Sequence, residues 1–173
     1  MRRCLYKVRL AERRDLHFLP KIELAASKRY FPFGVGDSVI NMTFPLELLE
    51  QRQYEGQLWV AADRRDRPVG FATSSVLDGI GHLDELSVLP KHGRQGLGGE
   101  LVSRVCDWAR FTSMHSVTLS TFEEIPWNVP FYQRLRFRIM RFEELTRGLL
   151  ILRDAERRAG LPVDRRVFMK REV

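Results

Sequence analysis

The chain has 173 residues, of which 44% are hydrophobic, and this length suits one domain that spans residues 1–173 and buries roughly 70% of its unfolded surface. Its 29 Lys and Arg exceed its 22 Asp and Glu, but they are scattered among acids and match no helix-turn-helix, RRM or zinc-finger pattern, which argues against nucleic acid as the partner. The sequence has no run of about 18 apolar residues, so we expect no membrane-spanning helix.

The N-terminal part predicts a strand followed by two helices. Residues 1–4 lead into an alternating strand at 5–10 rather than into an apolar signal core, so we expect a cytoplasmic protein. A helix then runs to about residue 30, and Pro20 either interrupts it or marks a late start. A second helix covers residues 45–53.

An aromatic loop separates these two helices. Residues 30–37 contain Phe31, Pro32, Phe33 and two glycines, a composition that excludes a regular element. Exposed aromatic side chains on a loop are candidates for binding a substrate. The alternative is that Phe31 and Phe33 fill the space between the helices, and the sequence leaves both interpretations open.

The rest of the chain alternates between strands and helices, with no repeat and no linker. The only cysteines are Cys4 and Cys106, which lie far apart in the sequence and predict reduced thiols rather than a disulfide or a metal site. The predicted elements that follow the second helix are strands at 57–63, 68–76 and 82–89, a helix from residue 97, a strand at 116–122, a helix at 128–136, a strand at 137–140, a helix at 146–159 and a strand at 166–170.

A glycine-rich turn joins the strand at 82–89 to the helix that begins near Leu97. Glycines at 93, 96, 98 and 99 let backbone N–H groups at the helix N-terminus approach an anion closely, and a phosphate is the expected ligand. The turn is not a dinucleotide fingerprint, because Leu101 stands where the third glycine is required, and it lacks the Gly-Lys-Ser/Thr of a Walker loop.

The run Gly93-Arg94-Gln95-Gly96-Leu97-Gly98, placed after Val88-Leu89-Pro90, resembles the acetyl-coenzyme A loop of the GNAT superfamily of N-acetyltransferases. The family pattern is Gln/Arg-x-x-Gly-x-Gly/Ala, and Gly93 departs from its first position. The resemblance implies an α/β (α+β) fold with a mixed, mostly antiparallel sheet of six to seven strands flanked by helices. It also implies coenzyme contacts from Leu86, Ser87, Val88, Gly93, Arg94, Gln95, Gly96, Leu97, Gly98 and Gly99.

A second stretch, residues 126–137, is similar to the other coenzyme-binding motif of that family. Asn128 precedes the pair Phe131-Tyr132, although Arg136 stands where the family has glycine. The resemblance implies that Asn128, Phe131 and Tyr132 contact the coenzyme and that Tyr132 protonates its thiolate. The alternative for Tyr132 is a buried tyrosine of the core.

The strand at 82–89 is expected to carry the remaining catalytic groups. Strict alternation places His82, Asp84, Leu86 and Val88 on one face, and Glu85 with Ser87 on the other. The resemblance implies that the Leu86 N–H stabilises the oxyanion and that Asp84 with His82 removes the amine proton. Glu85 is the rival base if a bulge shifts the alternation, and His82 is alternatively an ordinary strand residue with a hydrogen-bonded neighbour.

These observations favour an N-acetyltransferase that transfers the acetyl group of acetyl-coenzyme A to a primary amine by direct attack, without a metal. Glu123 follows the strand at 116–122 and either attracts the cationic amine or is a solvated surface residue. The acceptor is a small molecule or a peptide, and the aromatic loop and the tail beyond Glu144 shape its pocket or a homodimer contact. The rival function is a non-catalytic acyl-coenzyme A sensor or partner-binding module with the same fold.

Overall fold

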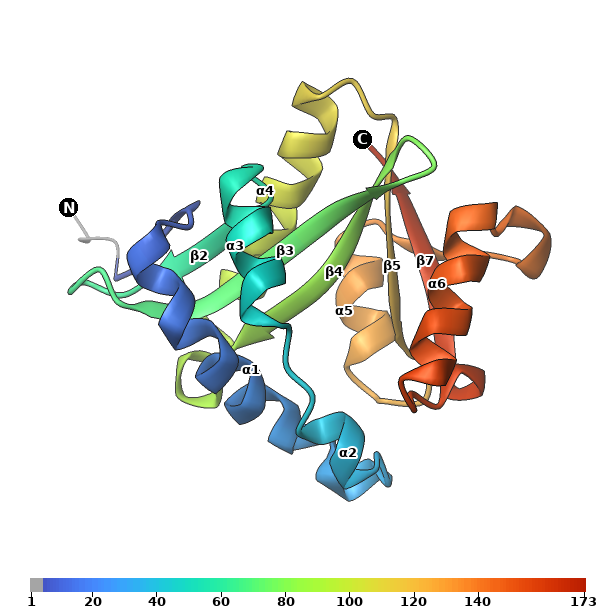
Figure 1. Cartoon of the computed structure of the whole chain (residues 1–173), viewed down its shortest axis with the longest axis horizontal. Helices are drawn as coiled ribbons and strands as arrows, with labels where there is room; N and C mark the ends of the chain where they lie inside the picture. The colour runs from blue at the N-terminus through green and yellow to red at the C-terminus, as the bar shows by residue number, and fades with distance from the viewer. Residues whose placement is uncertain (1–4) are drawn as a thin grey trace.

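Seven strands form one sheet in the order β1-β2-β3-β4-β5-β7-β6 in the computed structural model, which describes residues 5–173 (Figure 1). Every neighbouring pair is antiparallel except β4 and β5, which are parallel. This confirms the mixed, mostly antiparallel sheet expected from the sequence. The strands are β1 (Lys7–Leu10), β2 (Leu58–Ala62), β3 (Pro68–Leu77), β4 (Ile80–Val88), β5 (Ser116–Phe122), β6 (Arg138–Ile139) and β7 (Arg166–Glu172).

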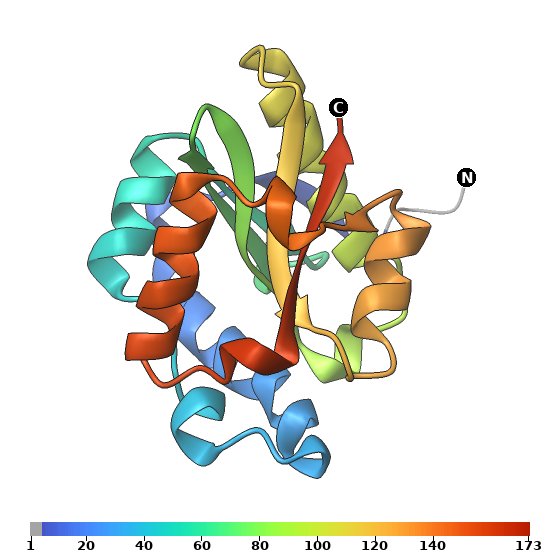
Figure 2. The same cartoon turned by 90° about the vertical axis from the view of Figure 1, so that its right-hand side faces the viewer.

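Helices cover both faces of the sheet (Figure 2). One face is covered by α1, α3 and α6, and the other by α4 and α5, while α2 extends the α1 side beyond the edge of the sheet. Within residues 5–173, no helix has the length and apolar character that crossing a membrane requires. The helices are α1 (Leu19–Ser27), α2 (Asp37–Ile40), α3 (Leu46–Tyr54), α4 (Leu97–Phe111), α5 (Asn128–Arg134) and α6 (Arg147–Arg158).

The apolar pattern explains why the sheet is covered twice. In β2, Leu58 and Val60 pack toward α1 and α3, whereas Trp59 and Ala61 pack toward α4. All five residues of β2 are buried, as expected for an inner strand with helices on both sides. Cys106 lies in the same core as a buried free thiol, while Cys4 lies outside the described residues.

The predicted elements differ from the structure in the N-terminal third. Pro20 is the second residue of α1, where its missing N–H costs nothing, so it marks the late start. The aromatic stretch is more regular than expected, because residues Lys28–Phe33 form a 3-10 helix and α2 follows it.

Two features of β4 create the space for a site. Its parallel pairing with β5 is confined to Gly81–Leu83 opposite Val117–Leu119, so the two strands separate beyond this point. On its other side, Leu83 pairs with Ser74 and Glu85 pairs with Thr73, which leaves Asp84 as the extra residue of a β-bulge.

The bulge overturns the predicted alternation along β4. Asp84 and Glu85 both reach the side of the sheet that His82 faces, and Leu86 turns to the opposite side, where it packs with the α4 core. The prediction that His82, Asp84 and Leu86 share a face is therefore wrong, because one inserted residue reverses the order of all side chains after it.

Candidate active site

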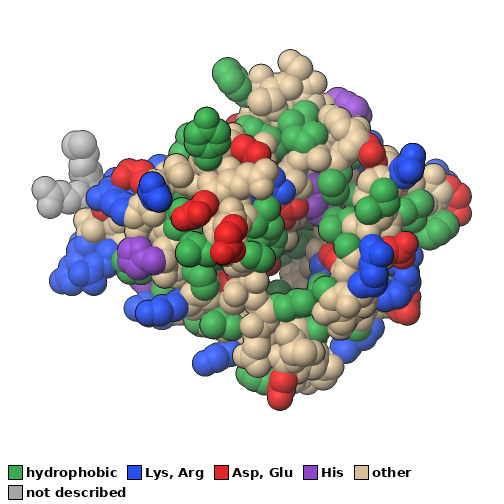
Figure 3. Space-filling model, viewed as in Figure 1, with side chains coloured by type: hydrophobic (Ala, Val, Ile, Leu, Met, Phe, Trp, Pro, Cys, Tyr) green, Lys and Arg blue, Asp and Glu red, His purple; other side chains and the backbone are tan. Residues whose placement is uncertain are grey.

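A cavity of about 510 Å³ opens where β4 and β5 separate. Its walls come from α1, the segment between α2 and α3, β4, β5 and the C-terminal part of the chain, and Tyr132 of α5 reaches it from the far side of the sheet. Figure 3 shows the surface hollowed between the α1–α3 side and the α6 side, with charged side chains visible in the hollow.

A backbone anion site lies at the N-terminus of α4. Gly96 precedes the helix with φ of 79°, and Arg94 also has a positive φ of 57°, so the turn is tight and uses a conformation that glycine favours. The first helical hydrogen bond is donated by the Glu100 N–H to the Gly96 carbonyl at 3.1 Å. The N–H groups of Leu97, Gly98 and Gly99 therefore have no partner within the helix and can receive an anion.

Gly98 brings this turn into contact with α5 and β4. A Cβ at Gly98 would lie 3.2 Å from Phe131 Cζ and 3.9 Å from Leu86 Cδ2. The absence of a side chain thus allows the helix terminus, the end of β4 and the aromatic pair of α5 to meet at one point. This contact joins two stretches that are far apart in the sequence and were both predicted to bind the same ligand.

Tyr132 extends from α5 into the cavity. Its ring is held edge-on by Phe131 at 4.9 Å and by Phe137 at 5.9 Å between centroids. Burial raises the pKa of Tyr132 above its usual value, and the neighbouring Tyr30 and Glu85 raise it further. The hydroxyl is therefore protonated at neutral pH and can donate a proton to a group formed beside it.

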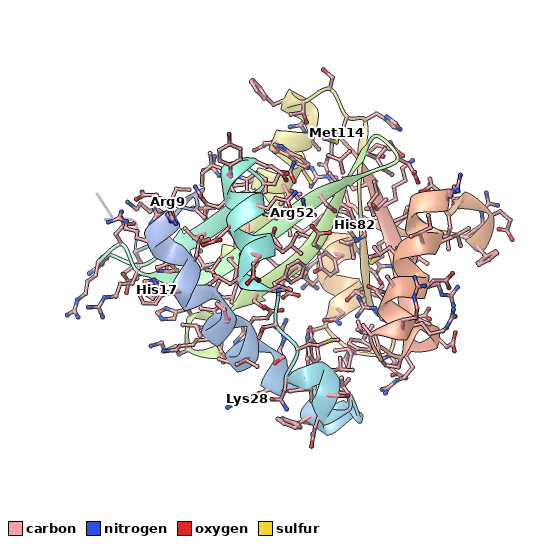
Figure 4. All side chains as sticks on the ribbon, in the orientation of Figure 1. Arg9, His17, Lys28, Arg52, His82 and Met114 are labelled. Carbon is pink, nitrogen blue, oxygen red and sulfur yellow. The ribbon has the colours of Figure 1, made fainter. Side chains whose placement is uncertain are left out.

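Asp84 is a half-buried carboxylate held by two polar neighbours. The Ser75 hydroxyl donates to Asp84 Oδ1 at 2.7 Å, and Arg52 Nε lies 3.6 Å from Asp84 Oδ2. Figure 4 shows Arg52 on α3, directly over the sheet. Burial raises the pKa of Asp84 to about 6, although the Ser75 hydroxyl and the Arg52 charge oppose the increase.

Glu85 occupies the next position of the bulge and also lines the cavity. The Ser87 hydroxyl donates to Glu85 Oε1 at 2.7 Å. Burial raises the pKa of Glu85, while the Ser87 hydroxyl and the charge of Arg29 partly offset this effect. The charge of Glu85 also raises the pKa of Tyr132, so the carboxylate and the phenol that line this cavity interact electrostatically.

His82 lies deeper, on the inner wall of the cavity (Figure 4). Its side chain is buried, and Nδ1 lies 2.9 Å from Thr118 Oγ1 on β5. Burial and, less strongly, the nearby charge of Arg166 lower the pKa of His82 to about 3, so the imidazole is neutral at physiological pH. The hydrogen-bond partners in the structure are Thr118 for His82 and Ser75 for Asp84, rather than each other.

The structure gathers some of the predicted site residues and separates others. The predicted β4 residues Asp84, Glu85, Leu86 and Ser87 line the cavity with Tyr132.

The predicted substrate contacts outside β4 and α5 do not line it. Phe31 is 50% exposed on the surface, and Phe33 packs edge-on against Trp127 at 5.1 Å, next to α5, so the two side chains do not together fill the space between the N-terminal helices either. Glu123 is exposed beyond the end of β5.

Sequence analysis missed several cavity residues. Glu23 and Arg29 come from the α1 side, and Glu156 and Arg166 come from α6 and β7. None belongs to a motif, and each reaches the cavity through contacts with residues far away in the sequence. The sequence predicted a helix in this region but not that a carboxylate, Glu23, would be buried on it.

The described residues 5–173 contain no group of three or more His, Cys, Asp and Glu side chains arranged to hold a metal ion.

Known structures share this fold. The PaiA N-acetyltransferase from Thermoplasma acidophilum, solved in complex with coenzyme A, is 13% identical, with a TM-score of 0.74 over 97% of this chain and 99% of that chain. N-acetylglutamate synthase from Neisseria gonorrhoeae, complexed with coenzyme A and N-acetyl-glutamate, is 15% identical, with a TM-score of 0.72 over 99% of this chain and 36% of that chain. The ribosomal-protein-S18-alanine N-acetyltransferase from Escherichia coli is 16% identical, with a TM-score of 0.65 over 97% of this chain and 94% of that chain.

A match to a family sequence model assigns the family of this chain, which similarity of fold at such low identity does not. Residues 25–137, which include the cavity-lining strand β4, the glycine turn and α5, match the sequence model of a single family. This chain belongs to the acetyltransferase (GNAT) family.

Proposed function

We propose that this protein is an N-acetyltransferase that transfers the acetyl group of acetyl-coenzyme A to a primary amine by direct attack. Members of its family use acetyl-coenzyme A. The observation that carries the proposal is the position of Glu85 and Tyr132, a carboxylate and a protonated phenol that face one cavity beside the glycine turn. These are the base and the acid that transfer between a thioester and an amine requires.

The chain offers groups that fit the coenzyme. The free N–H groups of Leu97, Gly98 and Gly99 fit a diphosphate, and β4 beyond Leu83 lacks a partner on the β5 side, where an extended pantetheine amide can pair. Asn128 Nδ2 is buried at the first residue of α5 without a hydrogen-bond partner among residues 5–173, as expected of a donor whose acceptor belongs to a ligand. When bound, acetyl-coenzyme A supplies an acyl thioester.

Three groups of this chain perform the transfer. Glu85 accepts the proton of the incoming amine, and the backbone N–H of Leu86, which lies close to the Glu85 carboxylate, stabilises the negative oxygen of the tetrahedral centre once Glu85 is protonated. Tyr132 donates its proton to the sulfur that leaves. The amine lone pair forms the new C–N bond while the C–S bond breaks, so no covalent enzyme intermediate is needed.

Glu85 is a better candidate for the base than Asp84 or His82. The charge of Glu85 raises the pKa of Tyr132, whereas Asp84 contacts Ser75 and Arg52. His82 has a pKa of about 3 and bonds to Thr118, so it is a weak base already committed to a neighbour. The raised pKa of Glu85 makes it a stronger base than an ordinary carboxylate.

The test combines binding with turnover. Calorimetry is expected to show binding of both acetyl-coenzyme A and coenzyme A, and a panel of primary amines is expected to release free thiol from acetyl-coenzyme A with formation of the acetylated amine by mass spectrometry. Binding without turnover on any amine would favour the non-catalytic sensor. No binding of either coenzyme to folded protein would overturn the proposal altogether.

A further inference from the structure

The acceptor end of the cavity contains a second carboxylate that the transfer itself does not need. Glu23 of α1 is only 7% exposed and lines the same cavity as Glu85. Its Oε2 accepts the backbone N–H of Phe44 at 3.0 Å, and no Lys, Arg or His within residues 5–173 forms an ion pair with it. A buried carboxyl group without a cationic partner resists ionisation, and a cation that arrives from outside the chain favours its charged form.

We infer that Glu23 is the specificity-determining residue that receives the protonated amine of the acceptor, and that the acceptor is a small monoamine with an apolar body and no carboxylate beside the amine. This inference rests on the proposed function. It assigns Glu23 to binding and leaves the proton transfer to Glu85.

The electrostatics of the two carboxylates support this assignment. Burial and then the charge of Glu85 raise the pKa of Glu23 to about 8, and burial also raises the pKa of Glu85. Each group thus resists ionisation while the other is charged. A cation placed between them removes this penalty, because it favours the ionised form of both.

The arginines of the cavity offset this negative charge only in part, because the charges of Arg29 and Arg166 lower the pKa of Glu85 less than burial raises it. Arg166 Nη2 lies 3.1 Å from Glu156 Oε1, so its charge is matched within the wall. Arg29 is exposed and stacks over the rings of Tyr30 at 5.2 Å and Trp127 at 5.9 Å. The interior next to Glu85 therefore favours a cation and disfavours an anion.

The remaining lining favours an apolar body. The cavity lining on the α1–α3 side is mainly apolar, with Ala26, Val39, Ile40, Phe44 and Leu48, and its hydroxyl groups come from Ser27, Tyr30 and Thr43. A peptide N-terminus would place its amide N–H and C=O groups against these apolar side chains without partners, which is unfavourable. A free amino acid would bring a carboxylate next to the two glutamates, which is also unfavourable.

Phenethylamine and phenylalanine test this directly, since they differ only by the carboxylate. Wild-type protein is expected to acetylate phenethylamine with a kcat/KM at least about tenfold above that for phenylalanine and for phenylalanyl-glycine amide. Equal or higher kcat/KM for either of the other two compounds would overturn the inference without any variant being made.

The matched variants are Glu23→Gln and Glu50→Gln. Glutamine keeps an oxygen for the Phe44 N–H but removes the charge, whereas Glu50 is exposed on α3 and outside the cavity. Glu23→Gln is expected to raise the KM for phenethylamine about tenfold or more, to change kcat less than about threefold, and to leave the affinity for coenzyme A unchanged. Glu50→Gln is expected to behave like the wild type.

The outcomes separate the two proposals. If amines are acetylated but Glu23→Gln leaves the KM unchanged, or lowers kcat without affecting the KM, the role of Glu23 is wrong and the proposed function stands. If coenzyme A binds and no amine is acetylated, the proposed function fails and this inference fails with it.

Discussion

Replacing Glu85 by glutamine is the sharpest test of the chemistry. The glutamine oxygen can still accept the Ser87 hydroxyl that now bonds Oε1 at 2.7 Å, so the side chain stays in place while its basicity is lost. A general base typically contributes about 10²–10⁴-fold to the rate, or about 3–5 kcal/mol of the barrier. We expect Glu85→Gln to lower kcat by about 10²–10³-fold while the affinity for acetyl-coenzyme A changes little.

Asp84→Asn is the matched comparison, because it removes the neighbouring carboxylate of the same bulge. It is expected to lower kcat by less than about tenfold, since Asp84 is tied to Ser75 and Arg52. Asparagine keeps an oxygen that accepts the Ser75 hydroxyl, so the main loss in this variant is the negative charge next to Arg52.

The pH dependence separates the two carboxylates further. A base works only when it is deprotonated, so kcat at saturating amine, where binding through Glu23 no longer limits the rate, must fall as the pH drops through the raised pKa of the base. Glu85→Gln removes this acidic limb, whereas Asp84→Asn retains it. If Asp84 were the base, the limb would lie near its pKa of about 6 and would disappear in Asp84→Asn.

The assay is the initial rate of thiol release at saturating acetyl-coenzyme A and saturating amine across the pH range, with calorimetry of coenzyme binding as the control for folding. Glu85→Gln within about threefold of wild type, together with a loss of about 100-fold in Asp84→Asn, would refute the assignment.

Three further predictions follow from the site and its supports. Tyr132→Phe keeps the ring contacts with Phe131 but removes the acid, so kcat is expected to fall about 10–100-fold with an unchanged KM for acetyl-coenzyme A, and equal turnover at every pH would contradict this. His82 has a folded pKa of about 3, below its unfolded value, so its stabilising effect is present above about pH 6.5 and is lost as the pH falls toward 3. At pH 4.5 it accounts for about 3 kcal/mol of acid destabilisation, and urea unfolding of His82→Gln should depend less on pH than that of the wild type. Gly96→Ala and Gly160→Ala both force a side chain into a positive φ, at about 1–2 kcal/mol each, but only Gly96→Ala should also weaken coenzyme A binding in calorimetry; equal affinities in the two variants would contradict the anion site.

The sequence predicted the parts of this molecule that depend on local chemistry. The bounds of β5 agree with the predicted strand, because its run of β-branched and apolar residues ends at charged Glu123. The glycine turn was predictable for the same reason. Gly96 is needed for its positive φ, and Gly98 is needed because it lets Phe131 approach the helix closely.

The bulge at Asp84 was not predictable from the strand itself. A bulge adds one residue without changing the composition, so the strand from His82 to Val88 reads as regular alternation until its pairing with β3 is known. The choice between Asp84 and Glu85 as the base depended on that single inserted residue.

Contacts between distant segments were the other limit. Glu23 and Arg166 lie on opposite sides of the cavity and are separated by most of the chain, and neither carries a motif. Only the order of the strands places β7 next to β5, and hence Arg166 beside the opening.

The position of β7 has a consequence for biosynthesis. This strand follows the other six strands in the sequence, yet it lies inside the sheet, between β5 and β6. A nascent chain in which only the residues up to 137 have been synthesised includes the part matched to the family. It still has an open edge on β5, and it lacks the wall of the cavity that β7 contributes. Residues 166–172 must therefore join the sheet before the wall of the cavity is complete, and deletion of this strand is expected to leave an exposed, aggregation-prone edge on β5.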